Sequence, residues 1–158
     1  MKILVFSDSH GDFAVLDRIV SANPEVDCFI FLGDGMRDLY SLRARHPGKR
    51  ILCVAGNCDV ECDEKSEDTL IAHGKKIYFT HGHIFEAEHG YGDLLNRAAS
   101  LDADIVCFGH THCSLSEIVG GIHILNPGSV SRPRDKKGAS YAVIDITQDE
   151  ILTKITKL

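Results

Sequence analysis

Residues 3–10 read Ile-Leu-Val-Phe-Ser-Asp-Ser-His, a run of four apolar residues followed by a serine, an aspartate, a serine and a histidine. The same order, an apolar run and then polar side chains, recurs four more times along the chain. The runs are continuous rather than alternating, which is typical of strands buried on both faces. They predict five strands, at residues 3–6, 28–32, 51–55, 77–79 and 105–108.

Helical patterns lie between several of these strands. Apolar residues recur at helical spacing over residues 13–20 and 91–98, and each set forms one apolar helix face. Strands that alternate with helices indicate an α/β fold with a largely parallel sheet. The last third is richer in strands: a hairpin is predicted at 118–125, with its turn at two glycines, and further strands at 141–146 and 151–156. We therefore expect a second sheet packed on the first.

Length and composition set further limits. The 158 residues are 44% apolar and 25% charged, which is ordinary for a globular protein. We see no linker or internal repeat, so we expect a single domain over residues 1–158. The chain has 17 basic and 23 acidic side chains and a net charge of −6. This charge excludes a general surface for long nucleic acid, which needs many Lys and Arg contacts to phosphate.

The expected location of the protein is the cytoplasm. No apolar run approaches the roughly 20 residues of a membrane span. The N-terminal run turns polar at Ser7, too early for the apolar centre of a signal peptide. Cys28, Cys53 and Cys107 lie inside apolar runs, where cysteine acts as a small apolar residue. We therefore expect reduced cysteines and no disulfide framework.

Aspartate, asparagine or histidine follows each of the five predicted strands. These side chains would gather at the carboxyl edge of the sheet, where open α/β sheets bind ligands. Mixed oxygen and nitrogen donors suit Mn²⁺, Fe²⁺ or Zn²⁺, and their number suits two ions about 3.5–4 Å apart that share a carboxylate. The residues are Asp8 and His10, Asp34, Asn57 and Asp59, His81 and His83, and His110 and His112.

Each of these residues taken alone has an ordinary explanation. A single histidine after a strand is usually hydrogen-bonded in the core or at the surface. An aspartate after glycine is usually a turn residue or a helix cap, and Asp12 could be only the N-cap of the following helix. The repetition of the pattern after five strands is what favours a metal site.

The ordered set Asp-x-His, Gly-Asp, Gly-Asn-x-Asp, His-Gly and Gly-His-x-His, spanning residues 8–112, resembles the calcineurin-like metallophosphoesterase superfamily. The short chain, Gly-Asn-Cys-Asp at 56–59 and Asn-Pro-Gly-Ser at 126–129 are similar to the small prokaryotic YfcE-like phosphodiesterase group. The resemblance implies a four-layer α/β/β/α sandwich with two mixed β-sheets.

The resemblance also implies a ligand set for two divalent ions. Mn²⁺ is the first expectation, and Fe²⁺, Zn²⁺ or Ni²⁺ are alternatives. Asp34 would bridge both ions, and His83 would contact substrate or a metal ligand, or lie at the surface. The implied ligands are, for the first ion, Asp8, His10 and His112 and, for the second, Asn57, His81 and His110.

The implied catalytic set is Asp34, Asn57, Cys58 and Asp59. Cys58 stands where most members of the superfamily carry a histidine that contacts phosphate and the leaving group. A thiol is a poor hydrogen-bond donor, so general-acid help should be weak. The expected activity is metal-dependent hydrolysis of a small phosphodiester by a hydroxide between the two ions, with good leaving groups favoured.

Several alternatives stay open from the sequence. The chain could be a phosphomonoesterase, or a metal-binding scaffold of the same fold that acts through protein partners, and it could form a homo-oligomer. Cys58 and Cys62 could belong to a structural zinc site. Residues 126–129, with Arg132 or Arg134 nearby, could offer donors to a substrate or form only a tight turn.

Overall fold

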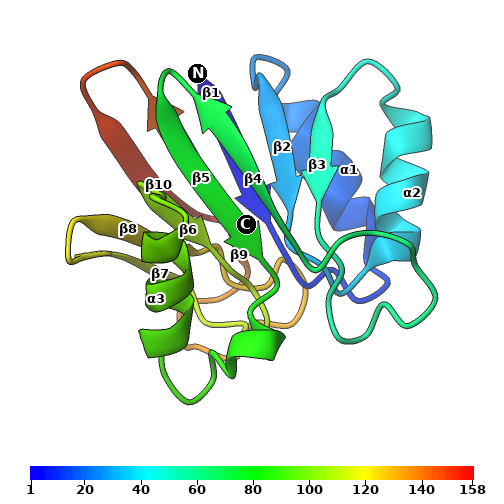
Figure 1. Ribbon diagram of the computed structural model, residues 1–158. Coiled ribbons are helices and arrows are strands. Elements are labelled where there is room, and N and C mark those ends of the chain that lie inside the picture. The colour runs from blue at the N-terminus through cyan, green and yellow to red at the C-terminus, as the bar shows by residue number, and fades with distance from the viewer.

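The computed structural model describes all 158 residues and forms two five-stranded sheets (Figure 1). The first sheet has the order β10-β9-β1-β2-β3, and the second has the order β4-β5-β6-β8-β7. In the first sheet the strands are β1 (Lys2–Phe6), β2 (Cys28–Phe31), β3 (Ile51–Cys53), β9 (Ser140–Ile146) and β10 (Ile151–Lys157). In the second they are β4 (Glu67–Ala72), β5 (Lys75–Thr80), β6 (Ile105–Cys107), β7 (Leu115–Val119) and β8 (Ile122–Asn126).

Both sheets are mixed. β1, β2 and β3 are parallel, and β9 and β10 extend the sheet in antiparallel fashion. In the second sheet β5, β6 and β8 are parallel, whereas β4 and β7 form antiparallel edges. The parallel strands of both sheets deliver their carboxyl ends to one side of the molecule.

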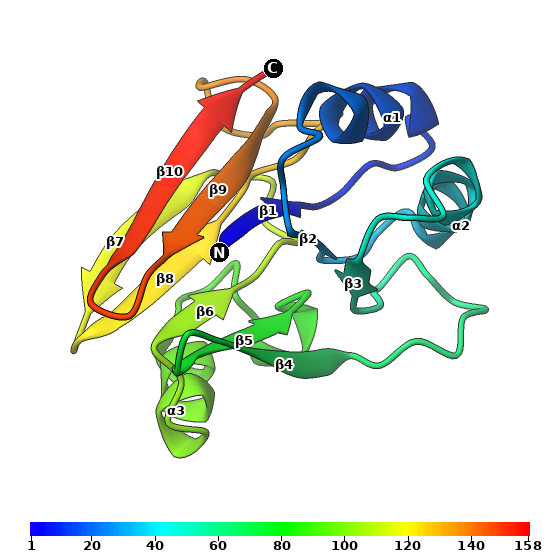
Figure 2. The same cartoon turned by 90° about the horizontal axis from the view of Figure 1, so that it is seen from above.

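Helices cover the outer face of each sheet, so the molecule has four layers (Figure 2). The helices are α1 (Phe13–Ala22), α2 (Met36–Arg45), α3 (Gly92–Ser100) and one 3₁₀ turn, η1 (His83–Phe85). α1 and α2 pack on the first sheet and α3 packs on the second. The four-layer α/β/β/α sandwich with two mixed β-sheets is therefore confirmed.

The continuous apolar runs follow from this layering. Ile3 and Val5 of β1 point into the cluster of 16 buried residues between the sheets. Leu4 and Phe6 point the other way, into the cluster of 15 buried residues beneath α1 and α2. Because successive side chains of a strand face opposite sides, a strand between two apolar layers needs apolar residues throughout.

The predicted strands are present, although several end earlier than expected. The runs at 28–32, 51–55 and 105–108 end as strands at residues 31, 53 and 107, where the loops of the carboxyl edge begin. The glycine hairpin joins β7 and β8, and Gly120 and Gly121 have φ angles of +58° and +86°, as a two-residue turn of type I′ requires. Asp12 is the N-cap of α1, since its Oδ1 accepts from the Val15 N–H at 3.1 Å.

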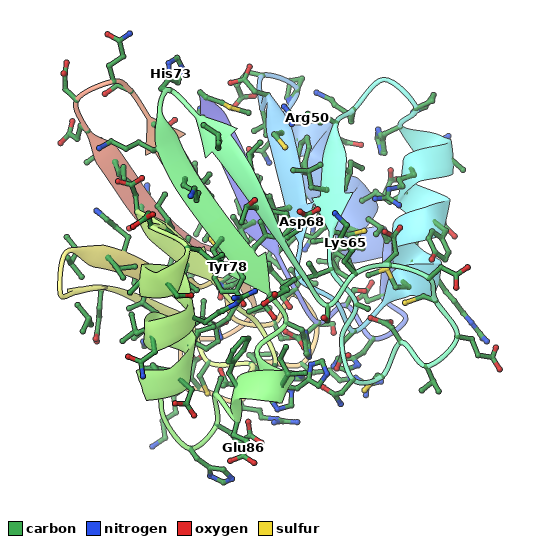
Figure 3. All side chains as sticks on the ribbon, in the orientation of Figure 1. Arg50, Lys65, Asp68, His73, Tyr78 and Glu86 are labelled. Atoms are coloured by element: carbon green, nitrogen blue, oxygen red, sulfur yellow. The ribbon has the colours of Figure 1, made fainter.

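Figure 3 relates the two ends of the sandwich to the sequence. His73 lies in the β4–β5 turn at one end, and Glu86 follows η1 at the other end, where the parallel strands terminate.

All six cysteines are free thiols, and Cys28, Cys53 and Cys107 are buried. None of the helices has the length and apolar character needed to cross a membrane.

Candidate metal centre

The loops at the carboxyl ends of the parallel strands converge on one cluster of ligand atoms. Three overlapping groups have their nitrogen, sulfur or carboxylate oxygen atoms within 4.8 Å of one another. Asp8 and Asp34 each belong to two of these groups, so the two carboxylates connect the set. The groups are Asp8 with His10 and His112, Asp8 with Asp34 and His81, and His10 with Asp34 and Cys58.

The backbone of these loops is strained at the residues that carry the donors. Five of the seven expected ligands have φ in the left-handed region, which non-glycine residues rarely adopt. Such strain persists only where the surrounding structure enforces it, and it concentrates at functional sites. The φ angles are +59° at Asp8, +46° at His10, +59° at Asp34, +65° at His110 and +59° at His112.

Two histidines are oriented by backbone carbonyl groups. The Nδ1 of His81 lies 2.6 Å from the Leu32 carbonyl oxygen, and the Nδ1 of His112 lies 2.6 Å from that of Arg132. Because a carbonyl can only accept, each Nδ1 carries a proton, and in the neutral ring Nε2 is left with a lone pair for a metal ion. Metal-binding histidines are commonly fixed in this way.

The free nitrogen atoms point at the two carboxylates. His81 Nε2 lies 3.6 Å from Asp34 Oδ2, and His112 Nε2 lies 3.2 Å from Asp8 Oδ1. His10 Nε2 lies 3.9 Å from both Asp8 Oδ1 and Asp34 Oδ2. The same oxygen of Asp34 is therefore within 4 Å of both His10 and His81, as a bridging ligand would be.

The surroundings of the Asp8 carboxylate indicate whether a cation fits among these residues. Its side chain is fully buried, and its Oδ1 has no hydrogen-bond partner. A buried carboxylate oxygen without a partner is costly, and a coordinated cation removes that cost. The donor chemistry agrees, since carboxylate and imidazole donors together suit Mn²⁺, Fe²⁺ or Zn²⁺. The residues present therefore fit divalent metal ions.

Asn57 and His110 lie at one side of the cluster, and His110 belongs to none of the three groups of ligand atoms. Asn57 Oδ1 lies 3.1 Å from His81 Nε2. The ring of His110 lies 5.2 Å from that of His81, and its Nε2 lies 3.1 Å from Glu88 Oε2, which leaves Nδ1 for another partner. Sequence reasoning did not single out Glu88, because nothing in its neighbourhood marks a contact with a residue 22 positions away.

Asp59 holds the loop that carries Asp34. Its carboxylate accepts from the backbone N–H groups of Asp34, Gly35, Met36 and Gly56, at 2.7 to 3.0 Å. It thereby satisfies the N-terminus of α2, whose N-cap residue Gly35 offers no side chain. The Cys58 N–H donates to Asp34 Oδ1 at 2.8 Å, so residues 58 and 59 together fix the position of Asp34.

The charges of the cluster shift its proton affinities. Burial works to raise the pKa of Asp34, but hydrogen bonding and charge attraction to His81, together with the Cys58 N–H, bring it well below its usual range. Burial works to lower the pKa of His81, but the carboxylates of Asp34 and Asp8 raise it. Burial lowers the pKa of His10, although the same two carboxylates oppose that shift.

Cys58 stays a neutral thiol in the metal-free protein. Burial, hydrogen bonding to Asp34 and the nearby carboxylates raise the pKa of Cys58 to about 11. Its Sγ belongs to the group with His10 and Asp34, whereas Cys62 belongs to none of the three groups. A structural zinc site that pairs Cys58 with Cys62 therefore has no support in the geometry.

His83 lies beside the cluster rather than in it. Its ring is 5.4 Å from that of His81 and 6.2 Å from that of His110, and its Nδ1 is buried without a hydrogen-bond partner. Burial and the neighbouring charges of His81 and His110 lower the pKa of His83. This position beside the centre leaves open both alternatives from the sequence, a substrate contact and a surface role.

Residues 126–129 hold the loops of the centre together. The Asn126 amide donates to the Gly109 carbonyl at 2.8 Å and the Ser129 hydroxyl to the Asp8 carbonyl at 2.8 Å. Both side chains are fully buried. The Arg132 carbonyl, as described, orients His112, and the Arg134 N–H donates to the His112 carbonyl at 3.0 Å. The hydrogen bonds of residues 126–129 are thus made to other loops of the protein, as expected if this segment forms only a tight turn.

One family model matches residues 1–149, that of the calcineurin-like phosphoesterase superfamily domain. The chain belongs to the calcineurin-like phosphoesterase superfamily. It is 38% identical over 151 residues to the probable metallophosphoesterase YsnB of Bacillus subtilis, covering 94% of this chain and 86% of that protein. It is 29% identical over 168 residues to the phosphodiesterase YfcE of Escherichia coli K12, covering 92% and 88%.

A solved structure agrees with this membership. The crystal structure of a conserved protein from Streptococcus pneumoniae TIGR4, described as a predicted phosphoesterase, superposes with a TM-score of 0.87 at 29% identity. The superposition covers 99% of this chain and 88% of the other. The resemblance to YfcE-like metallophosphoesterases inferred from the motifs is confirmed.

Proposed function

We propose that this phosphoesterase is a phosphodiesterase that uses two divalent metal ions, with Mn²⁺ as the first choice. The main support for the proposal is that Asp34 Oδ2 lies within 4 Å of both His10 and His81, and that the neighbouring Asp8 has an oxygen without a hydrogen-bond partner. Asp8, His10 and His112 would hold the first ion, Asn57, His81 and His110 would hold the second, and Asp34 would bridge the two. Divalent ions in such a site lower the pKa of bound water and neutralise charge on a phosphoryl group.

The chain itself positions these groups and supplies little general-acid chemistry. Asp59 and the Cys58 N–H hold Asp34, and the Leu32 and Arg132 carbonyls hold His81 and His112. Two divalent ions bring about four positive charges to the cleft, so the local charge outweighs the protein's net negative charge for an anionic substrate.

The presence of a thiol rather than an imidazole at Cys58 bears on the substrate class. A thiol donates hydrogen bonds poorly, so it gives little help to a departing alkoxide. Substrates whose leaving group is already stable, such as an aryl oxide, therefore suit this site. Diesters with good leaving groups should therefore be favoured over alkyl monoesters, and we propose the same preference over an aryl monoester.

The test compares bis(p-nitrophenyl) phosphate with p-nitrophenyl phosphate after the metal-free protein is reconstituted with Mn²⁺. The expected result is Mn²⁺-dependent turnover, faster for the diester, and a loss of at least about 10²-fold in Asp34→Asn, whose amide is a poor bridge between cations. Faster monoester turnover would favour the phosphomonoesterase alternative. Absence of turnover with either ester would favour a scaffold that acts through protein partners.

A further inference from the structure

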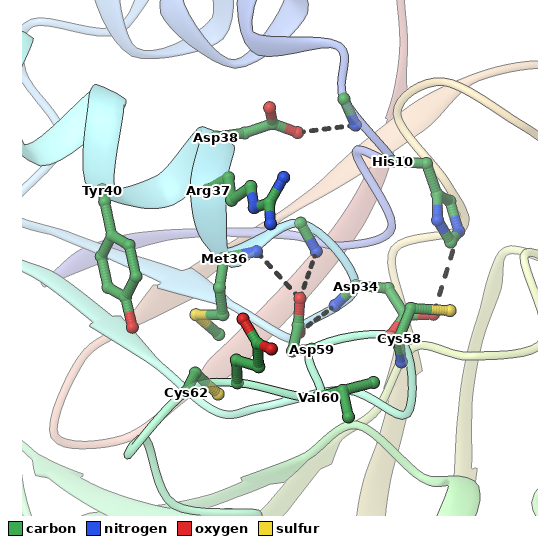
Figure 4. Close-up of a pocket in the computed structure, with 13 residues that line it drawn as sticks. His10, Asp34, Met36, Arg37, Asp38, Tyr40, Cys58, Asp59, Val60 and Cys62 are labelled. Carbon is green, nitrogen blue, oxygen red and sulfur yellow. Dashed lines mark hydrogen bonds and ion pairs between the residues drawn. The ribbon is translucent and has the colours of Figure 1, made fainter.

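A cleft of about 670 Å³ runs from the metal centre along α2. His10, Asp34 and Cys58 line it at the centre, and Tyr40 and Cys62 line it at the opposite end, as Figure 4 shows. A phosphoryl group held by the metal ions occupies only the first end. Clefts of roughly 300–1,000 Å³ accept organic ligands of drug-like size, so there is space here for a substituent of the substrate.

Part of the wall of the cleft beyond the centre consists of apolar side chains. Met36 and Tyr40 lie four residues apart on α2 and so share one face of the helix, about 6 Å apart along its axis. Val60 and Cys62, from the loop after β3, line the same cleft. Tyr40 and Val60 are 46% and 87% exposed, so both side chains are accessible to a ligand in the cleft.

The charges of the cleft argue against a second anionic group on that substituent. Arg37 is exposed and has no ion-pair partner, but Glu61, which lines the same cleft, is likewise exposed and unpaired. The carboxylates of Asp38 and Asp59 accept hydrogen bonds from neighbouring backbone N–H groups. The cleft therefore has no excess of positive side chains. A substituent with further phosphate groups would require such an excess.

We infer that the cleft along α2 binds an uncharged, flat or aromatic substituent of the phosphate ester, which lies against Tyr40 and Val60. The inference rests on the proposed function, because the phosphoryl group must be held at the metal centre for its substituent to reach α2. Tyr40 and Val60 are then specificity-determining residues. They act on binding of the substituent and leave the phosphoryl site unchanged.

The experiment measures binding rather than turnover. Isothermal titration calorimetry on the Mn²⁺-loaded protein compares inorganic phosphate, methylphosphonate and phenylphosphonate, whose carbon–phosphorus bonds are not hydrolysed. We expect phenylphosphonate to bind about 5- to 10-fold more tightly than methylphosphonate, from burial of the ring and its contact with an aromatic side chain. Tyr40→Ala and Val60→Ala should each reduce this ratio, and the double variant should bring it below about twofold.

Two control variants test whether the aromatic ring of Tyr40 itself causes the preference for phenylphosphonate. Tyr40→Phe keeps the ring and should keep the ratio. Ile118→Ala removes a side chain of similar exposure, 64%, from β7 outside the cleft, and it should change nothing. Inorganic phosphate should bind all variants equally, which also shows that they are folded.

Equal affinities for the two phosphonates in the wild-type protein would overturn the inference and leave the proposed function standing. So would a ratio that survives in the Tyr40→Ala, Val60→Ala double variant. Failure of the Mn²⁺-loaded wild-type protein to bind any of the three anions would refute the proposed function, and the inference with it.

Discussion

Gly56→Ala should damage the metal centre without unfolding the protein. A Cβ atom at position 56 would lie 2.1 Å from Asp34 Oδ1 and 2.6 Å from the Asp34 backbone nitrogen, whereas ordinary contacts begin at 3.4 Å. Asp34 must therefore move by about 1 Å, and its backbone with it. Overpacking of this kind costs about 1–3 kcal/mol.

The expected effects differ in size for stability and activity. For a chain of this length the stability loss corresponds to a fall in Tm of roughly 2–12 °C. A displacement of 1 Å at a reacting centre costs about 10²-fold in rate, so kcat/KM for the aryl diester should fall by that factor. Elemental analysis of the purified variant should show less Mn²⁺ per chain.

Gly48→Ala is the matched control. A Cβ at position 48 would meet no atom within 4 Å, and the φ angle there is not positive. This variant should keep the Tm, the metal content and the activity of the wild-type protein. If Gly56→Ala retained full activity and two ions per chain, the assignment of Asp34 as the bridging ligand would be wrong.

Three further substitutions test separate contacts. Cys58→Ala should keep the Mn²⁺ content, and a lower stoichiometry would show that the thiol is a ligand. Glu88→Gln should weaken the second ion about 10-fold in a metal titration by removing the charged partner of His110, whereas an unchanged isotherm would show that the contact is dispensable. The Arg97 guanidinium lowers the pKa of Glu67 from its usual 4.5, so this pair stabilises the fold fully above about pH 5 and loses that contribution progressively as the pH falls through the lowered pKa. Glu67→Gln should therefore lower the stability at pH 7 by an amount that shrinks as the pH falls below 4.5 in denaturant titrations; a difference that stays constant with pH would contradict the linkage.

The buried strands and the donors that follow them were predictable from the sequence, because both are local patterns. β4 and α2 were not predicted. β4 is an edge strand with only Leu70 and Ala72 buried, so it lacks a continuous apolar run. α2 begins at Gly35 without a capping side chain, since its cap is Asp59, which lies more than 20 residues further along the chain.

The residues of the site that belong to the local motifs were also predictable, whereas the contacts between distant loops were not. The motif placed Asp8, Asp34 and His81 at one edge, and the structure brings them together. The contact of Glu88 with His110 and the bonds that Asp59 accepts depend on how distant loops fold against each other. The cleft along α2 depends on the course of residues 57–62, which no spacing rule fixes.

The most direct measurement of the central claim is anomalous diffraction at the manganese edge from crystals of the Mn²⁺-reconstituted protein. The account predicts two peaks about 3.5–4 Å apart, with the Asp34 carboxylate between them and His10 and His81 on opposite sides. A single peak, or peaks that lie away from these residues, would contradict it.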